Sequence, residues 1–270
     1  MLPALIASDV DGTLLDDAER ISPRTRAAIH AAVVDGARFV LATGRPPRWI
    51  PQVVEALELA PLAVCANGAV IYDAATDRII SAHTLAPEQL AALTEVVRRV
   101  LPDAGLAVER VGRSARDDSF AQFASAPGYR HAWDNPDNTE TALEEMLALP
   151  AVKMLIRAEG ARSGDLLAAL APHIGRLGDL TYSTDNGLIE VVPRGFSKAT
   201  GVAEIAAPAG ILAEDVVAFG DMPNDIPMLK WAGLGVAMGN AAPQTQAAAD
   251  EVTTSNNDEG LARVLERWWM

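Results

Sequence analysis

The chain has 270 residues, half of them hydrophobic, and carries a net charge of −14 at pH 7. This acidic balance, without a basic run, excludes a nucleic-acid partner or an acidic membrane surface as the expected ligand. No apolar run approaches the roughly 18 residues of a membrane span, and residues 1–7 lack the basic region of a signal peptide. Cys65 is the single cysteine, so no internal disulfide can form. We therefore expect a cytoplasmic protein, either a monomer or a homodimer.

The first ninety residues alternate between strand-like and helix-like patterns. The first predicted helix has clear limits, because Ser22 suits the N-cap, Pro23 suits the first helical position and Gly36 suits the end. A second helix carries Ile50 and Leu57 on one face. The strand-like segments are 5–7, 37–42 and 62–66, followed by a hairpin of 69–72 and 78–82. This alternation predicts an α/β fold with a doubly wound parallel sheet.

The same pattern resumes late in the chain, with strands at 216–219 and 234–238 and a final helix that ends near Trp268. Between these two parts the pattern changes to mixed strands and helices, over a length that is too great for a loop. We therefore expect a catalytic α/β core formed by residues 1–84 and 187–270, with an α+β domain, residues 85–186, inserted into it.

Polar side chains directly follow four of the predicted strands. They are Asp9 and Asp11, then Thr43, Gly44 and Arg45, then Asn67, and last Asp221, Asn224 and Asp225. Ligands of open α/β sheets bind beyond the carboxyl ends of the strands, which places the four groups on one edge. Residues two apart in an extended segment point the same way, so Asp9 and Asp11 are expected to face one ligand. Taken alone, this pair is also compatible with a solvated acidic turn.

These residue types suit phosphoryl transfer from a phosphate monoester. The reaction needs a nucleophile, positive charge near the transferring oxygens and a proton for the leaving group. Carboxylates form the oxygen-rich kind of site that Mg²⁺ prefers. Thr43 offers a hydroxyl, and Lys198 offers a point charge for a phosphate. Standing alone, Lys198 and Arg45 would each be read as solvated residues at a helix start.

In this order, the motifs resemble those of the haloacid dehalogenase-like hydrolases. The four matching segments are Asp9-Val10-Asp11-Gly12-Thr13-Leu14, Thr43-Gly44-Arg45, Lys198, and Gly220-Asp221-Met222-Pro223-Asn224-Asp225. An insertion between the second and third motifs is similar to the Cof-type phosphatase branch, which has a type IIB cap. Ala199 is one departure, because Gly often follows the lysine in that family.

The resemblance implies a Mg²⁺-dependent phosphatase that hydrolyses a small phosphorylated metabolite, such as a sugar phosphate, through a phosphoaspartyl intermediate. It makes Asp9 the nucleophile and Asp11 the acid and base, while Thr43 and Lys198 hold the phosphoryl oxygens. The residues implied to bind substrate are Gly44, Arg45, Asn67 and Asn224. Mg²⁺ is implied to bind Asp9, Asp221 and the backbone carbonyl of Asp11, with Asn224 and Asp225 supporting the metal and the lysine.

Two other functions remain open from the residues alone. A phosphomannomutase-like mutase shares the opening motif, although it usually carries an extra Gly-Gly before the Asn-Asp of the last motif. A noncatalytic binding protein would be expected to lack one of the motif residues, and none is missing. Several cationic residues of the insertion could reach the leaving group or could equally lie on a solvated face, namely Arg113, Arg116, Arg130, His131 and Lys153.

Overall fold

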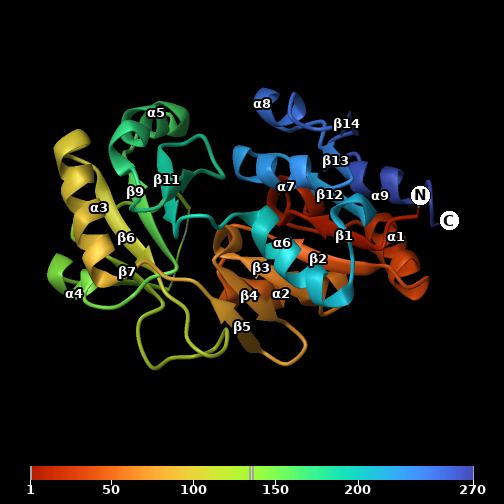
Figure 1. Ribbon diagram of the computed structural model, residues 1–270, viewed down its shortest axis with the longest axis horizontal. Coiled ribbons are helices and arrows are strands. Elements are labelled where there is room, and N and C mark those ends of the chain that lie inside the picture. The colour runs from red at the N-terminus through yellow and green to blue at the C-terminus, as the bar shows by residue number, and fades with distance from the viewer. Residues whose placement is uncertain (1, 134, 136, 270) are drawn as a thin grey trace. The chain divides into compact units, whose positions relative to one another are not determined.

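The computed structural model describes residues 2–133, 135 and 137–269, which fold as two compact units (Figure 1). The core unit comprises Met1–Ile80 and Ser197–Met270, and the inserted unit comprises Ser81–Phe196. The expected boundaries of 84/85 and 186/187 therefore need correction. The second differs most, because the strand Leu188–Val192 pairs with strands of the inserted unit rather than with the core sheet.

The core unit is built on an eight-stranded sheet in the order β14-β13-β12-β1-β2-β3-β4-β5. Its strands are β1 (Leu5–Ser8), β2 (Arg38–Ala42), β3 (Leu62–Cys65), β4 (Val70–Asp73), β5 (Arg78–Ala82), β12 (Val216–Gly220), β13 (Leu234–Ala237) and β14 (Glu251–Val252). Neighbours from β14 to β3 run parallel, whereas β4 is antiparallel to β3. All residues of β1 and β12 are buried, as expected for central parallel strands covered on both faces. The predicted α/β fold is confirmed.

In the described part of the core unit there are six α-helices. They are α1 (Pro23–Val34), α2 (Ile50–Leu57), α6 (Lys198–Ala206), α7 (Ile226–Trp231), α8 (Pro243–Gln246) and α9 (Gly260–Leu265). The predicted start of α1 is confirmed, because Ser22 Oγ accepts a hydrogen bond from the Thr25 N–H at 3.1 Å and Pro23 occupies the first turn. Arg24 ties this helix to the C-terminal segment through ion pairs with Glu259 and Glu266.

The inserted unit is an α+β fold around a six-stranded sheet in the order β10-β11-β9-β6-β7-β8. Its strands are β6 (Gly105–Glu109), β7 (Phe123–Ser125), β8 (Asn138–Glu140), β9 (Lys153–Arg157), β10 (Asp179–Thr181) and β11 (Leu188–Val192), and its helices are α3 (Pro87–Val100), α4 (Leu143–Leu147) and α5 (Ser163–Ile174). Leu106, Met154 and Ile189 point to the face where the helices pack. Ala107, Leu155 and Leu188 alternate with them and point to the opposite face.

Two of the cationic residues of the insertion have acidic partners inside this unit. The buried Lys153 ammonium donates a hydrogen bond to the buried Glu190 carboxylate of the same sheet. Arg130 Nε lies 3.8 Å from Glu159 Oε2 in an ion pair on the surface. Lys153 is thus ion-paired with Glu190 within the inserted unit. Among the described residues, no helix combines the length and apolar character that crossing a bilayer requires.

Candidate active site

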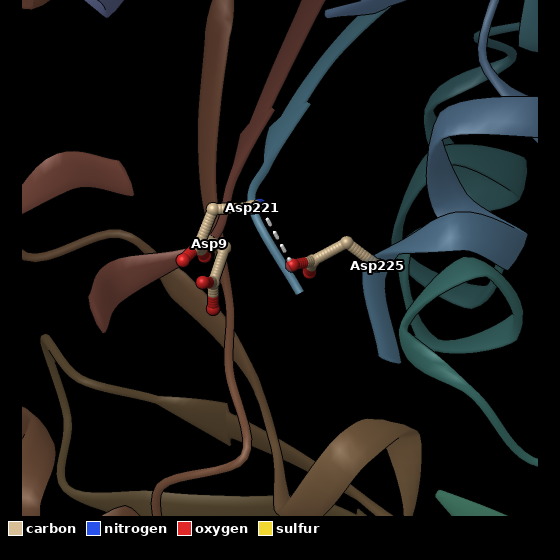
Figure 2. A group of neighbouring side chains, drawn as sticks. All are labelled: Asp9, Asp221 and Asp225. Atoms are coloured by element: carbon tan, nitrogen blue, oxygen red, sulfur yellow. Dashed lines mark hydrogen bonds between the residues drawn. The ribbon is translucent and has the colours of Figure 1, made fainter. Parts of the chain in front are cut away.

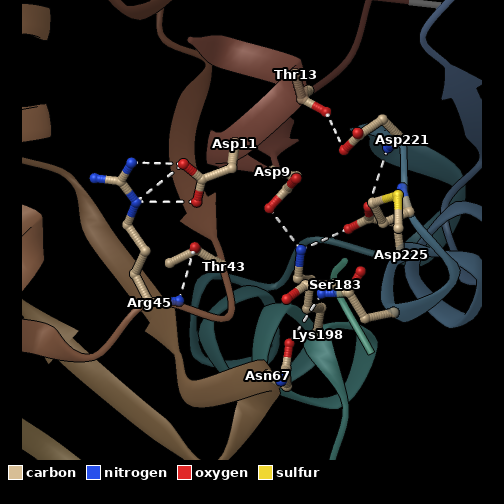
Figure 3. Close-up of polar contacts among 12 residues, drawn as sticks. Asp9, Asp11, Thr13, Thr43, Arg45, Asn67, Ser183, Lys198, Asp221 and Asp225 are labelled. Carbon is tan, nitrogen blue, oxygen red and sulfur yellow. Dashed lines mark hydrogen bonds and ion pairs between the residues drawn. The ribbon is translucent and has the colours of Figure 1, made fainter. Parts of the chain in front are cut away.

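The four polar groups that follow strands lie on one edge of the core sheet. Their strands, β12, β1, β2 and β3, are consecutive neighbours and run parallel, so their carboxyl ends share that edge (Figure 3). Asp9 follows β1, Thr43 follows β2 and Asp221 follows β12. Side chains that lie far apart in the sequence are thereby brought to one place.

Three buried carboxylates form the centre of this edge. Oxygen atoms of Asp9, Asp221 and Asp225 all lie within 4.8 Å of one another, and Figure 2 shows the three side chains near each other. Asp225 is held by the backbone, because its Oδ2 accepts the N–H groups of Asp221 (3.0 Å) and Met222 (2.9 Å). The turn Pro223–Asp225 therefore orients the Asp225 carboxylate.

Lys198 supplies positive charge to this group from the first residue of α6. Its Nζ lies 2.6 Å from Asp9 Oδ1 and 2.7 Å from Asp225 Oδ1, and only 1% of the side chain is exposed. Burial lowers the lysine pKa, but the charges of Asp225 and Asp9 outweigh burial and raise this pKa above its usual value. Lys198 thus stays protonated between two carboxylates.

The single positive charge of the Lys198 ammonium does not balance the negative charges of three buried carboxylates. Burial raises the pKa of Asp9 well above its usual value, and the charge of Asp225 adds to this effect while Lys198 opposes it. Burial, together with the Asp225 charge, raises the pKa of Asp221 to about 7. A cation bound by oxygen atoms would relieve this imbalance, and carboxylates are the ligands that Mg²⁺ prefers. The residues present fit a hard divalent ion.

Asp11 does not join this group through its side chain. The first strand ends at Ser8, and the chain then turns at Asp11 and at Gly12, whose φ is +75°. The Asp11 carboxylate instead accepts hydrogen bonds from Arg45, with Nη2···Oδ1 at 2.5 Å and Nε···Oδ2 at 2.9 Å. The premise of a continuous extended segment through Asp9 and Asp11 is therefore wrong, and in this structure Asp11 contacts Arg45 while Asp9 contacts Lys198 (Figure 3).

Arg45 is expected to act on the reaction by holding Asp11. Its side chain is 13% exposed, whereas that of Asp11 is 58% exposed, so a largely buried guanidinium holds the more accessible carboxylate. We expect Arg45→Ala to lower kcat about 10-fold, and Arg45→Lys to recover only part of the loss because an ammonium lacks the planar two-point geometry. Arg20→Ala is the matched control, since Arg20 pairs with Asp16 on the surface. Equal steady-state rates for Arg45→Ala and Arg20→Ala would contradict this role.

The remaining motif residues form a second buried polar layer. Asn224 Nδ2 donates to Asn67 Oδ1 at 3.0 Å, and a Cβ atom on Gly44 would lie 3.2 Å from the same oxygen. Asn224 Oδ1 is buried and has no hydrogen-bond partner among the described residues. Thr43 is fully buried, and its Oγ1 accepts the Arg45 backbone N–H at 3.0 Å. Asn224 Oδ1 is therefore available as an acceptor for a ligand, and the Thr43 hydroxyl is available as a donor.

The sequence did not identify Gly68 as a residue of the site. This glycine has φ of +101°, and a Cβ atom there would lie 2.0 Å from the backbone oxygen of Ser197, the N-cap of α6. The turn Ala66–Gly68 thus packs directly against the start of the helix that carries Lys198. A positive φ for Gly68 could have been suspected from the Asn-Gly pair, but the close contact could not.

We expect Gly68→Ala to destabilise the protein strongly. Gly36 offers a matched control, because it has the same φ of +101° but a Cβ atom added to it would meet nothing within 4 Å. Gly36→Ala should cost about 1–2 kcal/mol from backbone strain alone. Gly68→Ala should cost at least about 2 kcal/mol more, because the methyl group meets backbone that cannot move aside. The free energy of unfolding in urea measures both, and equal costs would refute the close packing.

Comparison with known proteins agrees with this geometry. A family model described as haloacid dehalogenase-like hydrolase matches residues 6–265. The chain belongs to the haloacid dehalogenase-like hydrolases. A phosphatase of 5-amino-6-(5-phospho-D-ribitylamino)uracil from Bacillus subtilis (strain 168) is 30% identical to this hydrolase, over 99% of the chain and 98% of that protein. The pyridoxal phosphate phosphatase YbhA of Escherichia coli (strain K12) is 29% identical, with 98% of each protein covered.

Solved structures share the fold of this hydrolase. A sugar phosphatase of subclass IIB superposes with a TM-score of 0.77 and covers 98% of both chains, and its 21% identity supports the fold alone. A haloacid dehalogenase-like hydrolase from Bacteroides thetaiotaomicron is 28% identical, with a TM-score of 0.74, and covers 98% of this chain and 99% of that one. The resemblance to the Cof-type branch with a type IIB cap is confirmed, and this hydrolase is a phosphatase.

Proposed function

We propose that this phosphatase hydrolyses a phosphomonoester of a small metabolite, with Mg²⁺ as cofactor and Asp9 as nucleophile. The observation that carries the proposal is the Asp9 carboxylate, which is buried, ion-paired to Lys198 and within 4.8 Å of two further carboxylates. Burial and the Lys198 ion pair hold this carboxylate at one position in the site, which supports its assignment as the nucleophile. The motif residues supply every other group that the reaction requires.

In the first step an Asp9 oxygen attacks phosphorus, so a phosphoaspartyl bond forms while the bond to the leaving oxygen breaks. Asp11 gives its proton to that oxygen. In the second step water attacks phosphorus, Asp11 takes a proton from the water, and the Asp9 carboxylate is released with inorganic phosphate. Arg45 donates to both Asp11 oxygens and so orients the carboxyl group, and it leaves lone-pair sites on that group for the transferred proton.

Binding of the phosphoryl group is assigned to Thr43 and Lys198. The Thr43 hydroxyl accepts the Arg45 N–H, and its own hydrogen can be donated to a phosphoryl oxygen. Asp9, Asp221 and the backbone carbonyl of Asp11 are the groups that would hold Mg²⁺, and Asp225 supports them by holding Lys198. When bound, Mg²⁺ would neutralise negative charge on the phosphoryl group and the carboxylates. We further propose that Gly44, Arg45, Asn67 and Asn224 line the part of the site that receives substrate.

Removal of divalent metal is expected to stop the reaction. Chelation with EDTA should lower the hydrolysis of p-nitrophenyl phosphate at least about 100-fold, and excess Mg²⁺ should restore it. Metal that binds only the folded protein also raises its melting temperature, which gives a readout independent of turnover. An unchanged rate and an unchanged melting temperature after chelation would together rule out the metal site.

The relatives support a substrate class for this phosphatase, and a panel of phosphate esters tests it. Two relatives are named for phosphatase activity on a ribitylaminouracil phosphate and on pyridoxal phosphate, which supports a polar organic phosphomonoester here. We expect phosphate release from at least one such compound or sugar phosphate at a kcat/KM well above that for p-nitrophenyl phosphate. Transfer of phosphate between sugar phosphates without net release would instead indicate a mutase.

A further inference from the structure

Two asparagines from the C-terminal part of the chain hold the turn that follows Asp9. Asn240 Nδ2 donates a hydrogen bond to the backbone oxygen of Gly12 at 2.8 Å. Asn256 Nδ2 donates to the backbone oxygen of Leu15 at 2.9 Å, and the Asn256 backbone N–H donates to Asn240 Oδ1 at 2.9 Å. The two side chains thus form one connected brace on the segment Val10–Leu14 and the residue after it.

Gly12 is the point of this turn where a brace has the greatest effect. With no side chain and φ of +75°, it has the widest choice of backbone conformations. A Cβ atom at this position would lie 2.3 Å from Asp221 Oδ2, so a residue with less conformational freedom cannot replace it. Within the turn, the Leu15 N–H donates to the Val10 oxygen at 2.9 Å, and contacts from outside the turn add to this restraint on Gly12.

The orientation of Gly12 sets the positions of its two neighbours. The peptide unit is planar and trans, so a fixed Gly12 carbonyl also fixes the direction of the Thr13 N–H. Thr13 Oγ1 donates to Asp221 Oδ1 at 3.3 Å, while on the other side Asp11 carries the carboxylate bound by Arg45. A rotation at Gly12 would shift both of these side chains at once.

We infer that Asn240 is a positioning residue for phosphate-ester hydrolysis, acting through the Gly12 carbonyl and supported by Asn256. The inference rests on the proposed function, since it assigns Asn240 an effect on the Asp11 and Thr13 side chains. Asn240 is itself exposed, and both ends of its carboxamide are used by the brace. We expect Asn240 to affect kcat rather than KM, because small displacements of reacting groups lower the rate of the chemical step steeply.

Three variants test this role. Asn240→Ala removes the donor and the acceptor, whereas Asn240→Asp keeps an acceptor for the Asn256 N–H but loses the donor to Gly12. Asn257→Ala is the matched control, because Asn257 Oδ1 accepts the Asp17 N–H, which lies beyond the braced turn. We expect kcat to fall about 10- to 100-fold in both Asn240 variants, with KM changed less than about threefold and Asn257→Ala close to the unmutated enzyme.

A second readout separates positioning from a general loss of structure. Backbone amide exchange within residues 10–15 should become faster in Asn240→Ala, while the melting temperature stays within a few degrees of that of Asn257→Ala. A kcat of Asn240→Asp equal to that of the unmutated enzyme would overturn the inference, as would unchanged exchange in this segment. If the unmutated enzyme itself releases no phosphate, the proposed function has failed, and the exchange measurement still decides whether the brace exists.

Discussion

Asp9→Asn should abolish phosphate-ester hydrolysis while leaving the fold at least as stable. The amide cannot attack phosphorus, so we expect kcat to fall at least about 1000-fold. Lys198 keeps its second partner, because its Nζ also contacts Asp225 at 2.7 Å. Steady-state release of phosphate from p-nitrophenyl phosphate measures the first effect.

The stability of this variant follows from the direction of the Asp9 pKa. Burial raises this pKa above the usual value of 3.8, so without metal the ionised carboxylate costs folding free energy as the pH rises above that value. Because the Asn side chain carries no charge, Asp9→Asn avoids this cost in folding free energy at pH 7. Urea unfolding of the metal-free proteins should therefore show no loss for Asp9→Asn. Activity that persists near the unmutated rate would contradict the assignment of the nucleophile.

Lys198→Met is expected to damage both turnover and stability. The side chain is 1% exposed, and its removal leaves the buried Asp9 and Asp225 carboxylates without their shared counter-charge. Breaking a buried ion pair by deleting one partner costs about 3–5 kcal/mol. The phosphoryl oxygens also lose a point charge, so we expect kcat to fall at least about 100-fold.

Lys153→Met is the matched control for this variant. Lys153 is also a buried lysine with a carboxylate partner, Glu190, but both lie in the inserted unit. It should lose a similar amount of unfolding free energy and keep its kcat on p-nitrophenyl phosphate. If the two variants lost turnover to the same extent, the effect of Lys198→Met would come from instability and the role of Lys198 would be refuted.

Local signals predicted the core of this fold well. Ser22 and Pro23 define the start of α1 through a side-chain cap and a fixed φ, both of which depend only on neighbouring residues. The shared edge of the site also followed from the sequence, because polar residues stood at the ends of four strands and parallel strands align those ends. Such features need no knowledge of distant contacts.

Two features depended on details that the sequence does not reveal. Asp11 was expected to face the same way as Asp9, but β1 ends at Ser8 and the turn through Asp11 and Gly12 breaks the two-residue repeat. The end of the inserted unit was placed too early, because β11 is as apolar as a core strand and its membership is decided by pairing with β9. In both cases the partner that decides the outcome, Arg45 for Asp11 and β9 for β11, is remote in sequence.

The most direct test of the account is to look for phosphate on Asp9. The enzyme should be mixed with Mg²⁺ and a substrate that it turns over, quenched in acid within milliseconds and digested for mass spectrometry. We expect a hydroxylamine-sensitive phosphate adduct on the peptide that contains Asp9, and none in Asp9→Asn. Rapid turnover with no adduct on that peptide, or with the adduct on another residue, would contradict covalent catalysis by Asp9.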